Sequence, residues 1–308
     1  MVDGETAGDP MSAQKWQRSS LRHVGDELTK KGHPISHTTV GRLLEDMKYS
    51  LKVNSKRLAG AEHPDRDQQF EYLEVQKKAF LAAGLPVISV DTKKKELIGN
   101  FKNSGRIWCQ EAEVVNDHDF AQDALGKAVP YGIYNLNHNL GYVYVGTSTD
   151  TPQFAVDMIA RWWTTEGRGL FLHASQILIL ADAGGSNGCR PHLWKQQLQA
   201  QLADQLGLEV TVCHYPTGTS KWNPVEHRLF GPISINWAGK PLRTFEVMLA
   251  CICGTVAETG LRVKAFLVDK VYQKGIKVAE EIMQALNIQR HEVCPRWNYT
   301  IKPRLVCS

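Results

Sequence analysis

The stretch Ile177-Leu-Ile-Leu-Ala-Asp182-Ala-Gly-Gly185 is an apolar run that ends in an aspartate and two glycines. An apolar run of this length before a glycine turn predicts a buried β-strand, with the aspartate where the strand gives way to a loop. An earlier run, Pro86-Val-Ile-Ser-Val-Asp91, ends in the same way. Ligands in open α/β sheets bind at such strand ends, so both aspartates are candidate functional residues.

Short apolar runs alternate with amphipathic helices around these two segments. The predicted elements after residue 86 are strands at 86–90, 131–136 and 141–145, a helix at 151–166, a strand at 176–180, a helix at 191–206 and a strand at 208–213. The order β, β, β, α, β, α, β, followed by a helix, predicts an α/β domain with an RNase H-like mixed sheet flanked by helices. Order alone also fits a truncated doubly wound fold.

A small helical domain is predicted before the sheet. Leu21, Val24 and Leu28 recur at helical spacing, and Ser36 can cap a second helix whose apolar face includes Val40. A short glycine-bearing connection between two short helices predicts a helix-turn-helix, in which the second helix enters the DNA major groove. The alternative is an ordinary pair of packed helices, but residues 12–60 carry ten basic side chains against four acidic ones, which favours DNA.

The sequence predicts three parts in the chain. Residues 1–62 form the helix-turn-helix region, residues 63–85 a linking helix that ends near Pro86, and residues 86–308 the catalytic α/β domain. Within the first part, Thr38 and Arg42 of the second helix are the candidate DNA contacts.

Composition excludes several classes of protein. Of the 308 residues 43% are hydrophobic and 22% charged, with a net charge of +4, which is typical of a globular protein. The longest apolar runs fall short of the roughly 20 residues that a membrane helix needs, and no secretory signal is apparent, so we expect a cytoplasmic protein without a membrane span. Seven scattered cysteines without a CxxC pair predict reduced thiols.

The carboxylates of Asp91, Asp182 and Glu226 are the candidate metal ligands. Magnesium prefers oxygen ligands, and carboxylates gathered at strand ends would repel one another without a cation. Each residue also has a structural interpretation. The aspartates can be turn formers, and Asn223-Pro-Val-Glu226 fits a helix start with Asn223 as the cap and Glu226 closing a capping box, which the local pattern alone favours.

Several long motifs appear in a fixed order along the chain. They are Ser36-His-Thr-Thr-Val-Gly-Arg-Leu-Leu44, His63-Pro-Asp-Arg-Asp-Gln-Gln-Phe70, Val90-Asp-Thr-Lys-Lys-Lys-Glu-Leu-Ile-Gly-Asn-Phe-Lys-Asn103, Asp150-Thr-Pro-Gln-Phe-Ala-Val156 with Trp162-Trp163, Leu180-Ala-Asp-Ala-Gly-Gly-Ser-Asn-Gly188, His214-Tyr-Pro-Thr-Gly-Thr-Ser-Lys-Trp-Asn-Pro-Val-Glu-His-Arg-Leu-Phe230 and Ile235-Asn-Trp237. From about residue 9 to about residue 304, the sequence resembles bacterial insertion-sequence transposases with a Rhodopirellula-type DDE domain. This resemblance implies an RNase H-like DDE transposase with Asp91, Asp182 and Glu226 as the catalytic, metal-binding triad.

The resemblance further implies two Mg²⁺ ions, for which Mn²⁺ can substitute, and double-stranded DNA as partner: the element's terminal inverted repeats and the target DNA. We expect a homodimer or higher assembly on DNA, associated with the bacterial nucleoid. Asp150 and Asp157 are weaker metal candidates. Lys93, Lys94, Lys221 and Arg228 are candidate phosphate contacts beside the site, although such lysines and arginines are equally typical of a solvated surface.

Family members usually carry a further DNA-binding segment before the point where this sequence begins, so we expect a chain shortened at its N-terminus. Two other functions therefore stay open: a truncated remnant that binds DNA without catalysing transposition, and a structure-specific nuclease that cuts without joining. His214 and His227 could carry protons near Glu226 or be structural, and Trp222 fits a core position better than a base-stacking one.

Overall fold

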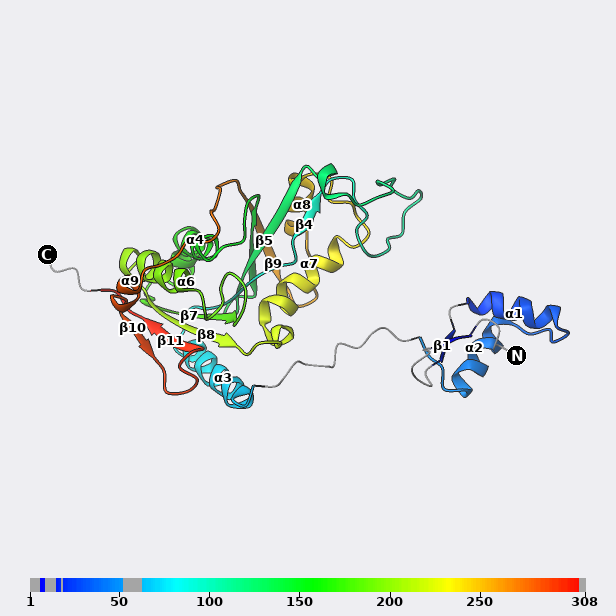
Figure 1. Ribbon diagram of the computed structural model, residues 1–308, viewed down its shortest axis with the longest axis horizontal. Coiled ribbons are helices and arrows are strands. Elements are labelled where there is room, and N and C mark those ends of the chain that lie inside the picture. The colour runs from blue at the N-terminus through cyan, green and yellow to red at the C-terminus, as the bar shows by residue number, and fades with distance from the viewer. Residues whose placement is uncertain (1–5, 9–14, 18, 52–62, 305–308) are drawn as a thin grey trace. The chain divides into compact units, whose positions relative to one another are not determined.

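A computed structural model describes residues 6–8, 15–17, 19–51 and 63–304 (Figure 1). The chain divides into two compact units, Met1–Ala59 and Gly60–Ser308. The predicted boundary at residue 62, and the basic residues Lys52, Lys56 and Arg57, fall outside the described residues. Each unit has buried apolar side chains of its own.

The first unit contains the two predicted helices. Helix α1 spans Leu21–Lys30 and α2 spans His37–Asp46, and their N-termini are capped by Ser20 and Ser36, whose hydroxyls each accept a backbone N–H bond of 3.2 Å. Val24 and Val40 are buried between the helices. Strands β1, Thr6–Gly8, and β2, Lys15–Gln17, form an antiparallel pair that the sequence did not predict. The helix pair itself is confirmed.

The second unit is built on a mixed sheet. Its strands are β3 (Val87–Thr92), β4 (Glu96–Ile98), β5 (Gly126–Asn135), β6 (Leu140–Gly146), β7 (Gln176–Asp182), β8 (Glu209–Tyr215), β9 (Arg262–Val268), β10 (Ile288–Arg290) and β11 (Asn298–Ile301). Their order in the sheet is β10-β11-β8-β7-β3-β5-β6-β9, and β4 pairs with β5 off this path. Strand β3 runs antiparallel to β5 and parallel to β7, while β7 runs parallel to β8 and β5 antiparallel to β6. The central order β8-β7-β3-β5-β6 with these directions is the RNase H-like arrangement that the element order predicts, so the predicted fold class is confirmed.

Every helix and strand that the sequence predicts for this unit occurs, with shifted ends, beside further elements that it does not predict. The helices are α3 (Arg66–Ala82), α4 (Pro152–Trp162), α5 (Arg168–Leu170), α6 (His192–Gln197), α7 (Gly231–Asn236), α8 (Phe245–Cys253) and α9 (Glu280–Gln284). π-Helical segments extend α4 through Gly167 and α6 through Gln205, and a third π-helical segment, Glu226–Phe230, precedes α7.

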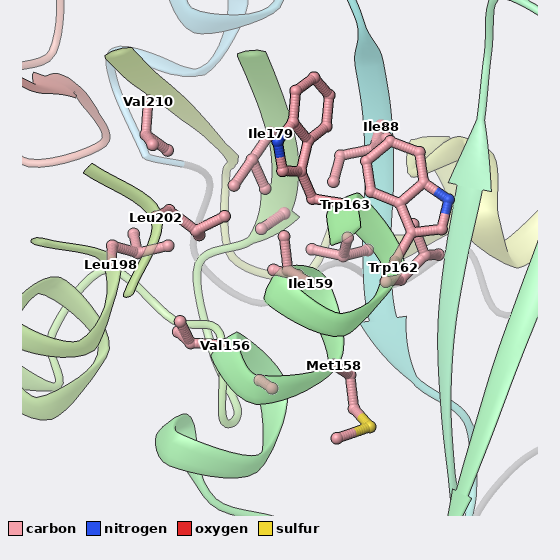
Figure 2. Packing of buried hydrophobic residues seen from close by; sticks show 14 of the residues in the cluster. Ile88, Val156, Met158, Ile159, Trp162, Trp163, Ile179, Leu198, Leu202 and Val210 are labelled. Atoms are coloured by element: carbon pink, nitrogen blue, oxygen red, sulfur yellow. The ribbon is translucent and has the colours of Figure 1, made fainter. Parts of the chain in front are cut away.

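One face of the sheet packs against α4 and α6. Alternate residues of β3 and β7, among them Ile88 and Ile179, meet Ile159 and Trp162 of α4 and Leu202 of the α6 extension in one buried cluster (Figure 2). Strand side chains alternate between faces, so Leu178 and Leu180 point to the other side. There they pack against Leu73 and Phe80 of α3. Strand β7 is therefore buried on both faces, as its continuous apolar sequence predicts.

Helices α7 and α8 cover the part of the second face formed by β5 and β6. Phe230, Ile233 and Met248 belong to a buried cluster with Val143 and Val145 of β6. Because the Glu226–Phe230 turn leads directly into α7, this cluster also fixes the segment that carries Glu226.

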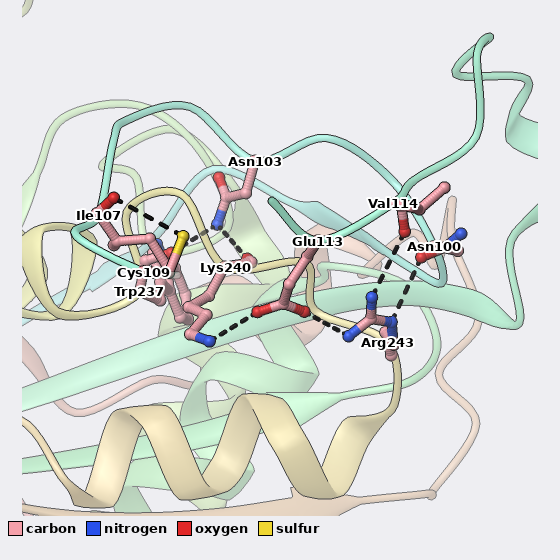
Figure 3. Close-up of polar contacts among 9 residues, drawn as sticks. All are labelled: Asn100, Asn103, Ile107, Cys109, Glu113, Val114, Trp237, Lys240 and Arg243. Carbon is pink, nitrogen blue, oxygen red and sulfur yellow. Dashed lines mark hydrogen bonds and ion pairs between the residues drawn. The ribbon is translucent and has the colours of Figure 1, made fainter. Parts of the chain in front are cut away.

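A long loop, residues 99–125, connects β4 to β5. Glu113 anchors it to the segment before α8, since one carboxylate oxygen accepts a 2.6 Å bond from Lys240 and the other is bonded by Arg243 (Figure 3). The side-chain amide of Asn103 adds bonds to the carbonyls of Trp237 and Lys240. The loop is thus tied at several points to the end of α7.

Strands β4, β9, β10 and β11 were not predicted. Strand β9 pairs in parallel with β6 at one end of the sheet, and the β10–β11 pair extends the other end beyond β8. Among the residues that the structure describes, no helix is long and apolar enough to cross a membrane.

Gly132 of β5 can be used to test how the Glu226–Phe230 segment packs on the sheet. It is the pairing partner of Asp91 and lies under Phe230. A Cβ at this position would come within 2.5 Å of the Phe230 ring. We expect Gly132→Ala to lower the free energy of unfolding by about 1–3 kcal/mol, because overpacking forces the Glu226 segment off the sheet. Urea unfolding measures the change. Gly169→Ala, where a Cβ meets nothing within 4 Å, is the matched control and should have little effect; equal stability of both variants would contradict this packing.

Candidate active site

Two of the candidate carboxylates lie at the ends of neighbouring parallel strands. Val90 of β3 pairs with Ala181 of β7, so the next residues, Asp91 and Asp182, follow at the same edge of the sheet. Both side chains are partly buried. One carboxylate oxygen of Asp91 accepts a 2.7 Å bond from the backbone N–H of Thr92. The sheet topology therefore brings together the two aspartates that the sequence singled out.

Glu226 reaches the same edge from the segment after β8. The first turn of its helix is held by Ser89 of β3, whose buried hydroxyl accepts a 2.9 Å bond from the N–H of Val225 and donates to the side-chain oxygen of Asn223. The side-chain amide nitrogen of Asn223 donates to Asp182 at 3.0 Å. Asn223 is thus a bridge between the helix and Asp182, and the predicted capping box is wrong because a serine from the sheet supplies the cap.

Each of the three carboxylates has a raised pKa, and burial is the main cause in each case. Burial, and then the negative charge of Asp182, raise the pKa of Asp91 to about 8, with smaller contributions from Glu226 and Asp150. Burial raises the pKa of Asp182 to about 6, against the Asn223 hydrogen bond. Burial also raises the pKa of Glu226, while a hydrogen bond with Asp91 and the positive charges of Lys93 and His227 oppose this shift.

The donor set fits a hard divalent cation. Three partly desolvated carboxylates, each less stable when charged, are oxygen ligands whose mutual repulsion a cation would remove. In the part of the chain that the structure describes, no three His, Cys, Asp or Glu side chains are arranged so that together they could hold a metal ion. The three carboxylates therefore match a divalent cation in the chemistry of their oxygen atoms and not in their spacing in this structure.

A cleft of about 480 Å³ opens beside Asp91, and its rim is basic. Lys93, Lys94, Lys95 and Lys127 line it together with Asp150, Gly185 and Ser186. Lys94 and Lys127 are exposed, whereas the Lys93 side chain is only 11% exposed, pairs with Glu96 at 3.1 Å and lies over the Trp237 ring. Lys127 was missed by the sequence, because only the antiparallel pairing of β5 with β3 and β4 brings residue 127 to this cleft.

The two weaker acidic candidates separate in the structure. Asp150 stays at the site, where it accepts a 3.2 Å bond from the Thr92 hydroxyl and lies 3.7 Å from Lys95. Asp157 is paired with Lys270 at 2.6 Å and accepts a 2.9 Å bond from the Tyr272 hydroxyl. It is not among the charges that shift the pKa of Asp91.

The basic residues next to Glu226 are exposed. Lys221 and Arg228 both face solvent, with the Lys221 ammonium over the Trp222 ring. Trp222 itself is 41% exposed and packs one side against Phe70 and the guanidinium of Arg66. The prediction that Trp222 is a core residue is therefore wrong: its segment lies at the outer surface of α3. In the first unit, Thr38 and Arg42 are also exposed on α2.

His214 is structural. It is fully buried, with Nδ1 3.0 Å from the Asp182 carbonyl and Nε2 3.1 Å from the Tyr299 hydroxyl, which also accepts a 2.9 Å bond from the Trp194 indole. A carbonyl can only accept, so Nδ1 carries the proton and Nε2 accepts from Tyr299. Burial lowers the pKa of His214 to about 4, so the ring is neutral and fixes the strand end that bears Asp182. His227, by contrast, is exposed.

The sequence profile described as Rhodopirellula transposase DDE domain matches residues 1–303. Among solved structures, the Mos1 transposase paired-end complex with left transposon end is similar with a TM-score of 0.44 and 11% identity, covering 78% of this chain and 71% of that one. The Mos1 mariner paired end complex with Mn gives a TM-score of 0.44 and 13% identity, covering 74% and 64%. No curated protein matches the sequence.

The raised pKa of Asp91 predicts how stability depends on pH without metal. Folding disfavours its charged form, so wild-type stability should fall as the pH rises from about 4 to about 8. Asp91→Asn cannot ionise and keeps an acceptor for the Thr92 N–H. We therefore expect it to be more stable than wild type at pH 8 in a chelator, on the order of a few kcal/mol, with the gain vanishing near pH 4.

Urea unfolding at several pH values measures this difference. Asp157→Asn is the matched control with the opposite expected sign, because it keeps an acceptor for the Tyr272 hydroxyl but removes the negative charge that pairs with Lys270. A destabilised Asp91→Asn at pH 8 would show that Asp91 is not held among repelling carboxylates.

Proposed function

The chain belongs to the Rhodopirellula transposase DDE domain family and is a DDE transposase, and we propose that Asp91, Asp182 and Glu226 carry its chemistry. The observation that supports this proposal is the convergence of three carboxylates from distant parts of the sequence. They come from the ends of β3 and β7 and from the helix after β8, and the charges of Asp182 and Glu226 raise the pKa of Asp91.

DDE transposases use divalent metal ions. Two Mg²⁺ ions, or Mn²⁺ in their place, would be held by the three carboxylates and would supply activation of the attacking oxygen and stabilisation of the leaving oxygen at phosphorus. The chain's own residues orient this site: Asn223 fixes the Asp182 carboxylate, Ser89 fixes the helix start, and His214 fixes the end of β7. In phosphoryl transfer, positioning and charge stabilisation supply most of the catalysis, so a covalent enzyme intermediate is not required.

The proposed substrates are the element's terminal inverted repeats and a target duplex, cut and joined at one site in a homodimer or larger assembly at the bacterial nucleoid. Exposed Lys94 and Lys127 beside Asp91, and Lys221 and Arg228 beside Glu226, would contact phosphates, which accounts for a basic rim around acidic residues. Lys93 would contribute mainly through its charge, because Glu96 already pairs with it.

Strand-resolved cleavage of DNA bearing the element's ends tests the triad. With Mg²⁺ or Mn²⁺, we expect Asp91→Asn, Asp182→Asn and Glu226→Gln each to reduce cleavage and joining by more than about 100-fold while DNA binding persists, because even the partners that orient metal ligands are worth about 10- to 100-fold. The control is Asp117→Asn, which alters a carboxylate with 93% side-chain exposure and should leave the rate unchanged.

The outcomes separate the competing functions. Metal-dependent cutting that survives in Asp182→Asn would contradict the assignment of the triad. DNA binding without cutting in the wild type would favour the truncated remnant, and cutting without joining would favour a nuclease.

The proposed role of α2 in reading DNA gives a separate prediction. Arg42 is exposed on the second helix of the pair, where a helix-turn-helix presents side chains to the major groove. We expect Arg42→Ala to weaken binding to element-end DNA by about tenfold and to reduce the preference over unrelated DNA. Mobility-shift titrations compare it with Lys78→Ala on α3, which should bind normally; an unchanged preference in Arg42→Ala would exclude Arg42 from recognition.

A further inference from the structure

A second pocket, of about 720 Å³, lies next to the carboxylate cleft. Its walls are the loop after β7, the hairpin between β10 and β11, and the residues just before α3. Gly185 lines both this pocket and the cleft beside Asp91. Because Gly185 lines both hollows, a strand that lies in the cleft beside Asp91 has a short path into the pocket.

The pocket is strongly basic. Arg190, Lys195, Arg290 and Arg296 line it, and Asp65 is its one acidic lining residue. Asp65 already lies 3.6 Å from the ring nitrogen of His63. Within the described part of the chain, none of these four cations takes part in an ion pair with a carboxylate. A concave surface with this excess of positive charge attracts an anion.

Lys195 is the most unusual of the four cations. It lies on α6, is only 5% exposed, and its ammonium donates to the carbonyl of Cys189. Burial lowers the pKa of Lys195, and the nearby charge of Arg290 lowers it further, against the effect of Cys189. A buried cation next to a second cation and without a carboxylate partner destabilises the fold. An anionic ligand between Lys195 and Arg290 would remove this cost.

We propose that the pocket binds a backbone phosphate of the DNA strand that leaves the carboxylate cleft, with Lys195 and Arg290 as its ligands. This inference rests on the proposed function, because it takes DNA as the substrate. A phosphodiester supplies the missing negative charge, and the shared Gly185 supplies a continuous path from Asp91. Arg190 and Arg296, both exposed on the wall, would hold the neighbouring part of the strand.

The pocket is also linked to Asp182. The Lys195 ammonium lies 5.6 Å from the centre of the Tyr299 ring, and Tyr299 bonds to His214, which in turn bonds to the Asp182 carbonyl. A phosphate at Lys195 would therefore contact a side chain that packs against the buried network fixing the end of β7. Lys195 and Arg290 are positioning residues, because they hold the strand at a fixed offset from the triad.

Two cysteines provide a direct probe of this pocket. Cys189 and Cys294 line it, while Cys109 and Cys253 are exposed outside its lining. Alkylation of each cysteine by N-ethylmaleimide is followed by peptide mass spectrometry, with and without element-end DNA, in metal-free buffer. We expect DNA to slow labelling of Cys189 and Cys294 several-fold and to leave Cys109 and Cys253 unaffected. Unchanged rates at Cys189 and Cys294 under conditions where DNA is bound would overturn the proposal.

Substitutions test the charges themselves. Lys195→Gln keeps a donor for the Cys189 carbonyl but loses the charge, and Arg290→Gln alters an exposed side chain. Each should reduce the salt dependence of DNA binding, the slope of log K against log salt, by about 0.9, as for one lost phosphate contact. Lys195→Arg should retain the slope, and the control Arg168→Gln on α5 should not change it.

If both Lys195→Gln and Arg290→Gln kept the wild-type salt dependence of DNA binding, Lys195 and Arg290 could not be the phosphate ligands. These binding measurements do not depend on the triad. If the triad proposal is wrong, DNA should still protect the two cysteines; if the cysteines are unprotected while cleavage is normal, only the pocket proposal is wrong.

Discussion

The parallel pairing of β3 with β7 places Asp91 and Asp182 at adjacent strand ends, where burial and the negative charge of Asp182 disfavour a negative charge on Asp91. Asn223 donates to Asp182, the Thr92 N–H donates to Asp91, and the fixed tautomer of His214 holds the end of β7 from behind. Each bond offsets part of the cost of keeping charge in a partly buried place. A divalent cation would offset the remainder, which couples the stability of this edge to metal binding.

The same edge explains why the third carboxylate comes from a helix rather than a strand. Ser89 lies on β3, on the face opposite Ile88 and Val90, and there it caps the helix of Glu226. Phe230 then packs over Gly132, where no larger residue fits without displacement. These two contacts hold the helix of Glu226 against the sheet. The basic rim of the cleft and the basic pocket lie on either side of the loop that follows Asp182.

The sequence predicted the fold well where its patterns are local. The apolar runs of β3 and β7 and the stripes of α4 and α6 were sufficient for the order of the central elements. It failed where tertiary contacts decide. Asn223 has the pattern of a helix cap, but a serine 134 residues earlier takes that role and frees Asn223 for Asp182. Trp222 stays 41% exposed although Phe70 of α3 packs against it. Lys195 lines a basic pocket only because the β10–β11 hairpin brings Arg290 and Arg296 to the same pocket. Local sequence patterns do not predict contacts between segments that are far apart in the chain.

The most direct test of a shared metal site is calorimetric titration of Mn²⁺ in buffers of different ionisation enthalpy near pH 7, which counts the protons that binding releases. Because the pKa of Asp91 is about 8, a bound metal should displace about one proton from wild-type protein, and Asp182→Asn should bind far more weakly. Mn²⁺ binding without proton release, and with equal affinity in Asp182→Asn, would contradict a single metal site formed by β3, β7 and the Glu226 helix.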